Sequence, residues 1–249
     1  MQNALLIGLS RQVALSRELD VVANNIANMN TTGFKADGSL FEEYLNSAAR
    51  AADTRVSFVQ DRATWIDMSA GALERTGNAL DVAINGDGFF AVQTQRGVRY
   101  TRNGSFQINP SGQLVTAQGD PVLGDGGPIT FQPTDRQISI SPDGTISVRE
   151  GNSKADSQRG KLRLVSFANP RQLQKDGNGT FNYAGNDAPV ETKTATIAQG
   201  ALEKSNVRAV VEMSRMIEIT RSYTQIAAML QQQSDLGQSS IDKLADVPN

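Results

Sequence analysis

The sequence contains no cysteine and no histidine among its 249 residues. It therefore has no thiol nucleophile, no disulfide and no imidazole, which excludes histidine-based catalytic dyads and triads and the usual ligand set of zinc. Catalysis by carboxylates alone is not excluded. Because cysteine-free chains occur in oxidising and reducing compartments alike, this absence does not indicate where the protein resides.

Aromatic residues and net charge are also scarce. Aromatics make up 6% of the residues, and the formal net charge at pH 7 is −2. The apolar residues are mostly aliphatic, which favours helical seams and short strands over a large aromatic-lined pocket. Without a block of lysine and arginine, neither nucleic acid nor an anionic membrane is expected as the main partner.

Long hydrophobic runs are missing as well. No stretch of about 18 apolar residues occurs, so we expect no membrane-spanning helix. The N-terminus lacks a basic segment, and its apolar stretch from Ala4 to Leu9 is followed at once by polar residues. We therefore expect no cleavable signal peptide. On composition alone, the default compartment is the cytoplasm.

Helical patterns are present at the two ends of the sequence. From Gln2 to Asn28, apolar residues recur three or four apart, which predicts an amphipathic helix about 40 Å long with a short coiled-coil-like seam. A second pattern begins near Ala201, with Ser205 and Asn206 as the expected N-cap. A polar break at 235–240 is expected to separate it from a short tail helix. We expect these stripes to pack on each other or on other chains.

An asparagine-rich segment, ANNIANMNTTGFK at 23–35, ends the first helical pattern. Its Asn, Thr and Gly residues bond their own backbone or take positive φ, so the helix should stop here. The asparagines have two interpretations: a capped, frayed helix end, or amides that fix register by bonding across helices. The following residues, 39–52, predict a weak second helix or an extended linker. The single tryptophan, Trp65, is expected to pack in this linker.

The middle of the chain alternates short apolar runs with Gly, Pro, Asn and Asp, which predicts antiparallel strands. Hairpins are expected over 80–92, 106–115 and 138–148, and a further strand over 162–167. The expected fold class is α+β, with long N- and C-terminal helices around a central antiparallel all-β domain. The expected division is a helix over 1–30, a linker over 31–68, a β-rich domain over 69–199 and a helix over 200–249.

Chemistry could reside only in the glycine- and aspartate-rich turns. The segments 86–88 and 125–127 precede strands rather than helices and match no phosphate-binding loop. Five aspartates near glycines are scattered singly, without the spacing of a calcium loop. These are Asp81, Asp87, Asp120, Asp125 and Asp143. We expect turns here, no catalytic residue, no metal, no cofactor and no enzyme activity.

Several segments together resemble the bacterial flagellar rod and hook proteins. Besides 23–35 they are GALEKSNVRAVVEMSRMIEITRSY at 200–223, LDVAINGDGFFAV at 80–92 and YTRNGSFQINPSGQLVT at 100–116. The middle is too short for the additional outer domain of hook proteins. GDPVLGDGGPITF at 119–131 and ISISPDGTISV at 138–148 resemble proximal rod proteins most, with distal rod proteins as the alternative.

The resemblance implies a structural axial subunit of the basal-body rod. Its terminal helices would pack in the tubular core, transmit torque and form the export-channel wall, while the β domain faces outward. The implied partners are copies of the chain and other rod proteins. The implied location is the periplasmic rod, reached through the flagellar type III export apparatus without signal cleavage, which replaces the cytoplasmic default.

The residues expected to make assembly contacts lie on the two stripes and in the terminal motifs. They are Leu5, Leu9, Val13, Leu19, Val22, Asn24, Asn25, Ile26, Asn28, Thr32, Gly33, Phe34, Ser205, Asn206, Val207, Val210, Met213, Ile217, Arg221 and Tyr223. Other hypotheses remain: a secreted carboxylate enzyme acting on peptidoglycan, for which no paired motif is visible, and a coiled-coil adapter that never polymerises. The stripes could also form an antiparallel stalk within a monomer.

Overall fold

The computed structural model describes residues 2–45, 57–151, 155–185, 187–192 and 194–245. The chain combines a helix near each end with antiparallel sheets between them in sequence, and it divides into two compact units. We call Met1–Ala27, Asp37–Trp65 and Arg208–Asn249 the helical unit. We call Asn28–Ala36 and Ile66–Val207 the β unit.

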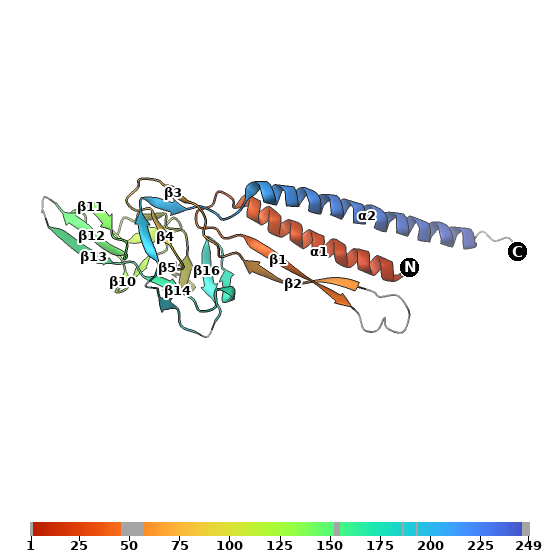
Figure 1. Ribbon diagram of the computed structural model, residues 1–249, viewed down its shortest axis with the longest axis horizontal. Coiled ribbons are helices and arrows are strands. Elements are labelled where there is room, and N and C mark those ends of the chain that lie inside the picture. The colour runs from red at the N-terminus through yellow and green to blue at the C-terminus, as the bar shows by residue number, and fades with distance from the viewer. Residues whose placement is uncertain (1, 46–56, 152–154, 186, 193, 246–249) are drawn as a thin grey trace. The chain divides into compact units, whose positions relative to one another are not determined.

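The helical unit contains helices α1 (Gln2–Ala27) and α2 (Ala209–Ala245), which lie side by side (Figure 1). The first helix ends where the sequence predicts. The second begins later than expected, because Ala201–Glu203 forms strand β19. The predicted break at 235–240 is wrong, since α2 continues through it. No proline interrupts this exposed stretch, and Gln231 donates a hydrogen bond to Asp235 one turn later.

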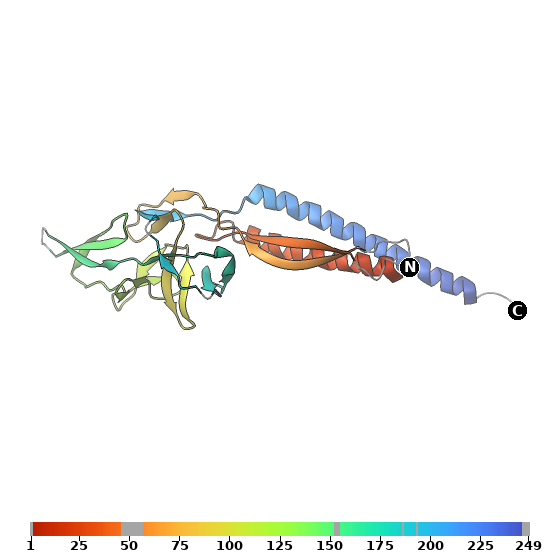
Figure 2. The same ribbon diagram turned by 60° about the horizontal axis from the view of Figure 1, so that its bottom comes forward.

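Two strands, β1 (Asp37–Leu45) and β2 (Ser57–Ile66), pair with each other and lie alongside α1 (Figure 2). Of the two alternatives for 39–52, the extended one therefore holds and the second helix is wrong over 39–45; residues 46–52 lie outside the described residues. Trp65 covers Gly38, where an added Cβ would come within 2.4 Å of the indole Nε1. The indole thus packs on the paired strand, as expected for the linker.

The β unit is built on a six-stranded antiparallel sheet in the order β15-β16-β6-β5-β14-β17. These strands are β15 (Leu173–Lys175), β16 (Thr180–Tyr183), β6 (Gly97–Thr101), β5 (Phe89–Thr94), β14 (Leu164–Ser166) and β17 (Val190–Glu191). A short 3-10 helix, Pro170–Gln172, precedes β15. A second sheet has the order β11-β12-β13, formed by Asp135–Ile140, Thr145–Glu150 and Asp156–Lys161.

Four two-stranded pairs complete the β unit among the described residues. They are β3 (Leu73–Arg75) with β19, β4 (Val82–Asn85) with β18 (Thr196–Gln199), β7 (Phe106–Ile108) with β8 (Leu114–Thr116), and β9 (Leu123–Gly124) with β10 (Gly127–Pro128). The predicted hairpins over 106–115 and 138–148 are confirmed. The one over 80–92 is wrong, because β4 pairs with β18 while β5 pairs with β6 and β14.

The position of β5 explains that difference, because both of its faces are buried. Phe90 and Val92 enter the larger core cluster, which also takes Val82 and Ile84 from β4. Phe89 points to the other face and joins a smaller cluster with Phe181. Because β5 is buried, its backbone N–H and C=O groups need hydrogen-bond partners on both edges, and β6 and β14 supply them. No helix in the described part of the chain is long and apolar enough to cross a membrane.

Candidate assembly site

The two helices of the helical unit pack on each other, and each buries a few apolar side chains. Ala14 and Val22 on α1, and Ile219 on α2, are buried. Gly8 allows a close approach, since an added Cβ would lie 2.6 Å from Cδ2 of Leu230. One ion pair also joins the helices, as described next. Val22 and Leu230 belong to the predicted stripes, whereas Ala14 and Ile219 lie outside them, so the expectation that the stripes pack on each other is met only in part.

Glu18 and Arg215 form that ion pair, with the guanidinium 2.7 Å from the carboxylate. Asn25 is buried near the end of α1, where its Oδ1 accepts a hydrogen bond from the Asp37 amide at 2.9 Å. Its Nδ2 donates to the Asp37 carbonyl at 2.8 Å and reaches Glu212 on α2 at 3.4 Å. The Asn25 amide therefore fixes the start of β1 first and contacts the other helix second.

The remaining asparagines of the segment behave differently. Asn28 accepts hydrogen bonds from the backbone amide and the hydroxyl of Thr31, which closes a turn just after α1. Asn24 is exposed. The capped-end interpretation thus describes Asn28, whereas the cross-helix interpretation fits the contact of Asn25 with Glu212, which is longer than the bonds of Asn25 to Asp37.

Both helices also leave an apolar stripe exposed. On α1, Leu6, Leu9 and Val13 are each about half exposed. On α2, Val210 is 78% exposed and Ile217 70%, with Met213 between them. Residues three and four apart share one helix face, so each group forms a continuous strip. Contiguous exposed apolar surface is typical of a protein interaction site. We call these six residues the exposed stripes.

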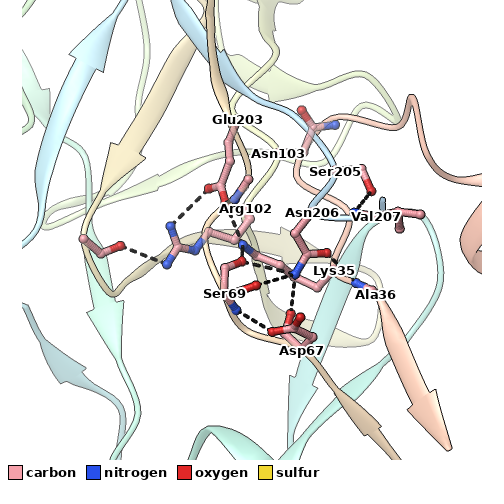
Figure 3. A network of polar contacts seen from close by, with 12 residues as sticks. Lys35, Ala36, Asp67, Ser69, Arg102, Asn103, Glu203, Ser205, Asn206 and Val207 are labelled. Atoms are coloured by element: carbon pink, nitrogen blue, oxygen red, sulfur yellow. Dashed lines mark hydrogen bonds and ion pairs between the residues drawn. The ribbon is translucent and has the colours of Figure 1, made fainter. Parts of the chain in front are cut away.

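A cluster of buried charges lies in the β unit (Figure 3). Its centre is Glu203 on β19, whose two carboxylate oxygens accept from Lys35 Nζ at 2.6 Å and from Arg102 Nη1 at 3.1 Å. All three side chains are at most 4% exposed. We call Lys35, Arg102 and Glu203 the Glu203 cluster. Burying these charges without partners would be costly, because they lose their contact with water. The charge-assisted hydrogen bonds between them offset that cost, since such bonds are stronger than bonds between neutral groups.

Further contacts surround the cluster, although Arg102 Nε is buried without a hydrogen-bond partner. Lys35 Nζ donates to the Ser69 carbonyl at 2.7 Å, and the Gly71 amide donates to Glu203 at 2.9 Å. Arg102 Nη2 donates to the Gly86 carbonyl at 2.9 Å, and its guanidinium lies over the ring of Phe89. Burial lowers the pKa of Lys35 below its ordinary value, and the hydrogen bond and charge of Glu203 partly oppose that effect.

The two terminal motifs bond directly to each other in the β unit. The Gly33 amide donates to the Glu203 carbonyl at 2.7 Å, and Asn206 Oδ1 accepts from the Ala36 amide at 2.7 Å. Asn206 Nδ2 donates to the carbonyls of Asp67 and Ser69 (Figure 3). Asn206 is therefore not the N-cap of α2, which begins three residues later. We call residues 33–36 and 203–206 with these bonds the motif junction.

Gly33 is required by this geometry. Its φ is +68°, and an added Cβ would lie 2.4 Å from the backbone nitrogen of Asn103. A non-glycine residue would meet both the left-handed strain and the backbone clash. Phe34 is buried next to it, and the Lys175 ammonium lies 4.0 Å from the centre of its ring. The last residues of the first motif therefore belong to the packed β unit.

The structure sorts the predicted assembly residues into three groups. Exposed are Leu9, Val13, Asn24, Val210, Met213, Ile217 and Arg221. Partly exposed are Leu19, Ile26, Asn28, Thr32, Ser205, Asn206, Val207 and Tyr223. Buried are Val22, Asn25, Gly33 and Phe34, whereas the side chain of Leu5 lies outside the described residues.

Sequence reasoning missed the three charged residues of the Glu203 cluster. Each lies inside a motif that the sequence already marks: Lys35 ends ANNIANMNTTGFK, Arg102 lies in YTRNGSF and Glu203 lies in GALEKSNV. The sequence did offer one signal for these residues, because the segments that resemble rod and hook proteins contain both positively and negatively charged side chains. Their pairing has no local pattern, because 168 residues separate Lys35 from Glu203.

Comparison with known proteins covers the same regions. The family model for the flagella basal body rod protein matches residues 5–35, the flagellar hook protein FlgE/F/G D1 domain matches 83–148, and the flagellar basal body rod FlgEFG protein C-terminal region matches 198–243. The region matched by the C-terminal model, 198–243, thus contains both Glu203 and the exposed stripe of α2.

Similar full-length proteins carry related names. The flagellar basal-body rod protein FlgF of Caulobacter vibrioides is 41% identical over 99% of this chain and 100% of its own. FlgF of Mesorhizobium japonicum is 36% identical over 98% of both chains, and the rod protein FlgG of Bacillus subtilis is 32% identical over 90% of this chain and 92% of its own. The chain belongs to the family of flagellar basal-body rod proteins, as a structural subunit similar to FlgF, with FlgG not favoured.

Proposed function

We propose that this chain is an axial subunit of the proximal rod, which polymerises through its terminal helices with copies of itself and with other rod proteins. The exposed stripes carry the proposal, because six apolar side chains on two helices are left in solvent although the helices already pack on each other. Neighbouring subunits would remove this surface from water. A tube grows by head-to-tail contacts, which remain open until another protein ends them.

The predicted site residues would then act in two ways. Leu9, Val13, Val210, Met213 and Ile217 would contact neighbouring subunits. The buried residues Val22, Asn25, Gly33 and Phe34 would instead hold the chain in the form that presents them, and Leu5 extends the α1 stripe in sequence.

The finer features of the role are part of the same proposal. Helices over 1–30 and 200–249 would form the axial core, transmit torque and line the export channel, and the β domain over 69–199 would face outward. The chain would reach the periplasmic rod through the type III export apparatus without signal cleavage. The role is structural rather than catalytic, in keeping with relatives that are named as rod proteins.

We further propose that the terminal helices gain order on assembly, which would prevent premature polymerisation. Among the described residues α1 buries few side chains and leaves three large apolar ones about half exposed, so its local stability in the free chain should be low. Amide hydrogen exchange on the monomer tests this: strong protection from Leu9 to Ile26 before assembly would contradict it.

The main test is Ile217→Asp, which places a charge in the exposed stripe without touching a buried group. We expect a normally folded monomer that is missing from isolated basal bodies, with motility lost. The matched control is Gln225→Asp, an exposed position of the same helix outside the stripe. Deletion of residues 1–30 separates the adapter hypothesis, because a non-polymerising adapter would leave the rod assembled. Normal incorporation of the Ile217→Asp chain would refute the assembly surface.

A further inference from the structure

We propose that the motif junction fixes the end of the N-terminal motif in one position relative to the C-terminal motif, and that Lys35 is its positioning residue. Assembly of the chain depends on this alignment and not on the stability that the contacts add. This inference rests on the proposed function as a rod subunit. It explains why two motifs far apart in the chain contain matching charged and amide groups.

Three kinds of contact hold the two motifs in register. Segment 33–36 is held to segment 203–206 by a backbone bond at Gly33, by the Asn206 side chain at Ala36, and by the Lys35–Glu203 ion pair. Backbone bonds alone tolerate a slip along a strand, whereas a buried ion pair with a fixed partner does not. The first motif can therefore meet the second in only one register.

Removal of Lys35 and removal of Glu203 should affect the Glu203 cluster differently. Arg102 and Gly71 both donate to Glu203, so the carboxylate keeps two donors if Lys35 is removed. If Glu203 is removed, two buried cations lose their carboxylate together. Lys35 also feels the charge of Asp67, a partly exposed residue that water can solvate. Removal of Lys35 therefore leaves Glu203 paired with Arg102, as removal of Arg102 would leave it paired with Lys35, but only Lys35 belongs to the first motif.

Asn206 provides a second set of contacts in the motif junction, and it shares the Ser69 carbonyl as an acceptor with Lys35. Its Nδ2 faces three oxygen acceptors: the carbonyl of Asp67 and both the carbonyl and the hydroxyl of Ser69. Aspartate has the same shape but only acceptors at its tip, so Asn206→Asp sets oxygen against oxygen. This change weakens the motif junction without altering any residue of the Glu203 cluster.

The decisive experiment compares full-length Lys35→Met and Asn206→Asp chains with the natural chain. Lys204→Met is the matched control, because Lys204 follows Glu203 directly but forms only an exposed pair with Glu74. Each chain is purified for amide hydrogen exchange, and each is also produced in cells that lack the natural chain to measure its amount in basal bodies.

We expect Lys35→Met and Asn206→Asp to speed exchange at the Gly33 and Ala36 amides roughly tenfold or more, while the amides of β5 exchange as before. The amount in basal bodies should fall by a similar factor, and Lys204→Met should behave as the natural chain. Normal assembly of either variant would overturn the inference. So would unfolding of the whole β unit by Lys35→Met, because Lys35 would then act as a core residue. Absence of the natural chain itself from basal bodies would instead refute the proposed function.

Discussion

The two units of this protein bury their apolar residues in opposite ways. In the β unit, Phe90, Val92, Ile146 and similar residues fill a continuous core from several sheets. In the helical unit, the described helices bury few large side chains and leave the exposed stripes in solvent. Burial of apolar area is the main source of folding stability, so the β unit should be stable alone while the helices remain dependent on neighbours.

The polar interactions differ in the same direction. The β unit holds a fully buried cluster in which each charge has a partner, whereas the Glu18–Arg215 pair of the helical unit joins two partly exposed side chains. Buried pairs are destabilising when broken and define one arrangement, while exposed pairs contribute little. The contacts of the β unit therefore define one fixed arrangement, whereas those of the helical unit can be replaced by contacts with neighbouring subunits.

The largest expected effect comes from Glu203→Gln, which leaves two buried cations without their carboxylate. We expect the free energy of unfolding of the β unit to fall by about 3 to 5 kcal/mol. Urea titration with hydrogen exchange at β5 measures it, and Glu74→Gln at an exposed pair is the control. A loss no larger than that of the control would mean that the Glu203 cluster does not stabilise the β unit.

A pair of isoleucines two residues apart on α2 tests the helical unit. Ile219 is 4% exposed and Ile217 is 70% exposed. Ile219→Ala should destabilise the helix pair by about 2 kcal/mol or more, since it removes buried methyl groups. Ile217→Ala should change the monomer by less than about 0.5 kcal/mol. Thermal unfolding followed by helical circular dichroism compares them, and equal effects would contradict the assignment of inner and outer faces.

The ion pair of the helical unit should matter much less. Glu18→Gln removes the carboxylate next to Arg215, and we expect a loss of about 0.2 to 1 kcal/mol in 0.1 M salt. The same unfolding experiment at low and high salt gives the value. A loss as large as that of Glu203→Gln would remove the contrast between the two units.

The smallest effect concerns pH and the sheet of β11, β12 and β13. Arg159 donates two hydrogen bonds to Asp135 and holds the pKa of that carboxyl below its ordinary value. This stabilisation is present above the unfolded-state pKa of about 3.9 and is lost as the pH falls through the lower folded-state value. Carboxyl NMR titration should show the depressed pKa, and Arg159→Met should return it towards normal. An unchanged pKa in that variant would mean that Arg159 is not the cause.

Local signals in the sequence predicted the elements that depend on local interactions. The first helix follows from its apolar spacing and ends before Gly33, and the hairpin around 109–112 follows from its turn residues. The prediction failed where distant residues decide the structure. The pairing of β4 with β18 is set by a shared core, and Ala201–Glu203 is drawn into a strand by β3 rather than into the helix.

The residues of the candidate site show the same difference between local and long-range signals. Periodicity identified the exposed stripes, because a helix repeats every few residues. It also marked Val22, which the structure buries instead of exposing. The Glu203 cluster was missed, since its residues approach only when the β unit closes. Motif membership marked the segments concerned, but only the three-dimensional contacts show which charges meet.

The most direct test of the assembly surface uses the absence of natural cysteine. A chain with Ile217→Cys carries a single thiol, whose reaction with a maleimide can be measured in the free monomer and in isolated basal bodies. We expect fast labelling in the monomer and strong protection in basal bodies, while Ile219→Cys labels more slowly than Ile217→Cys in the monomer and is protected in basal bodies. Equal labelling of Cys at position 217 in both states would contradict the claim that the exposed stripes are covered by neighbouring subunits.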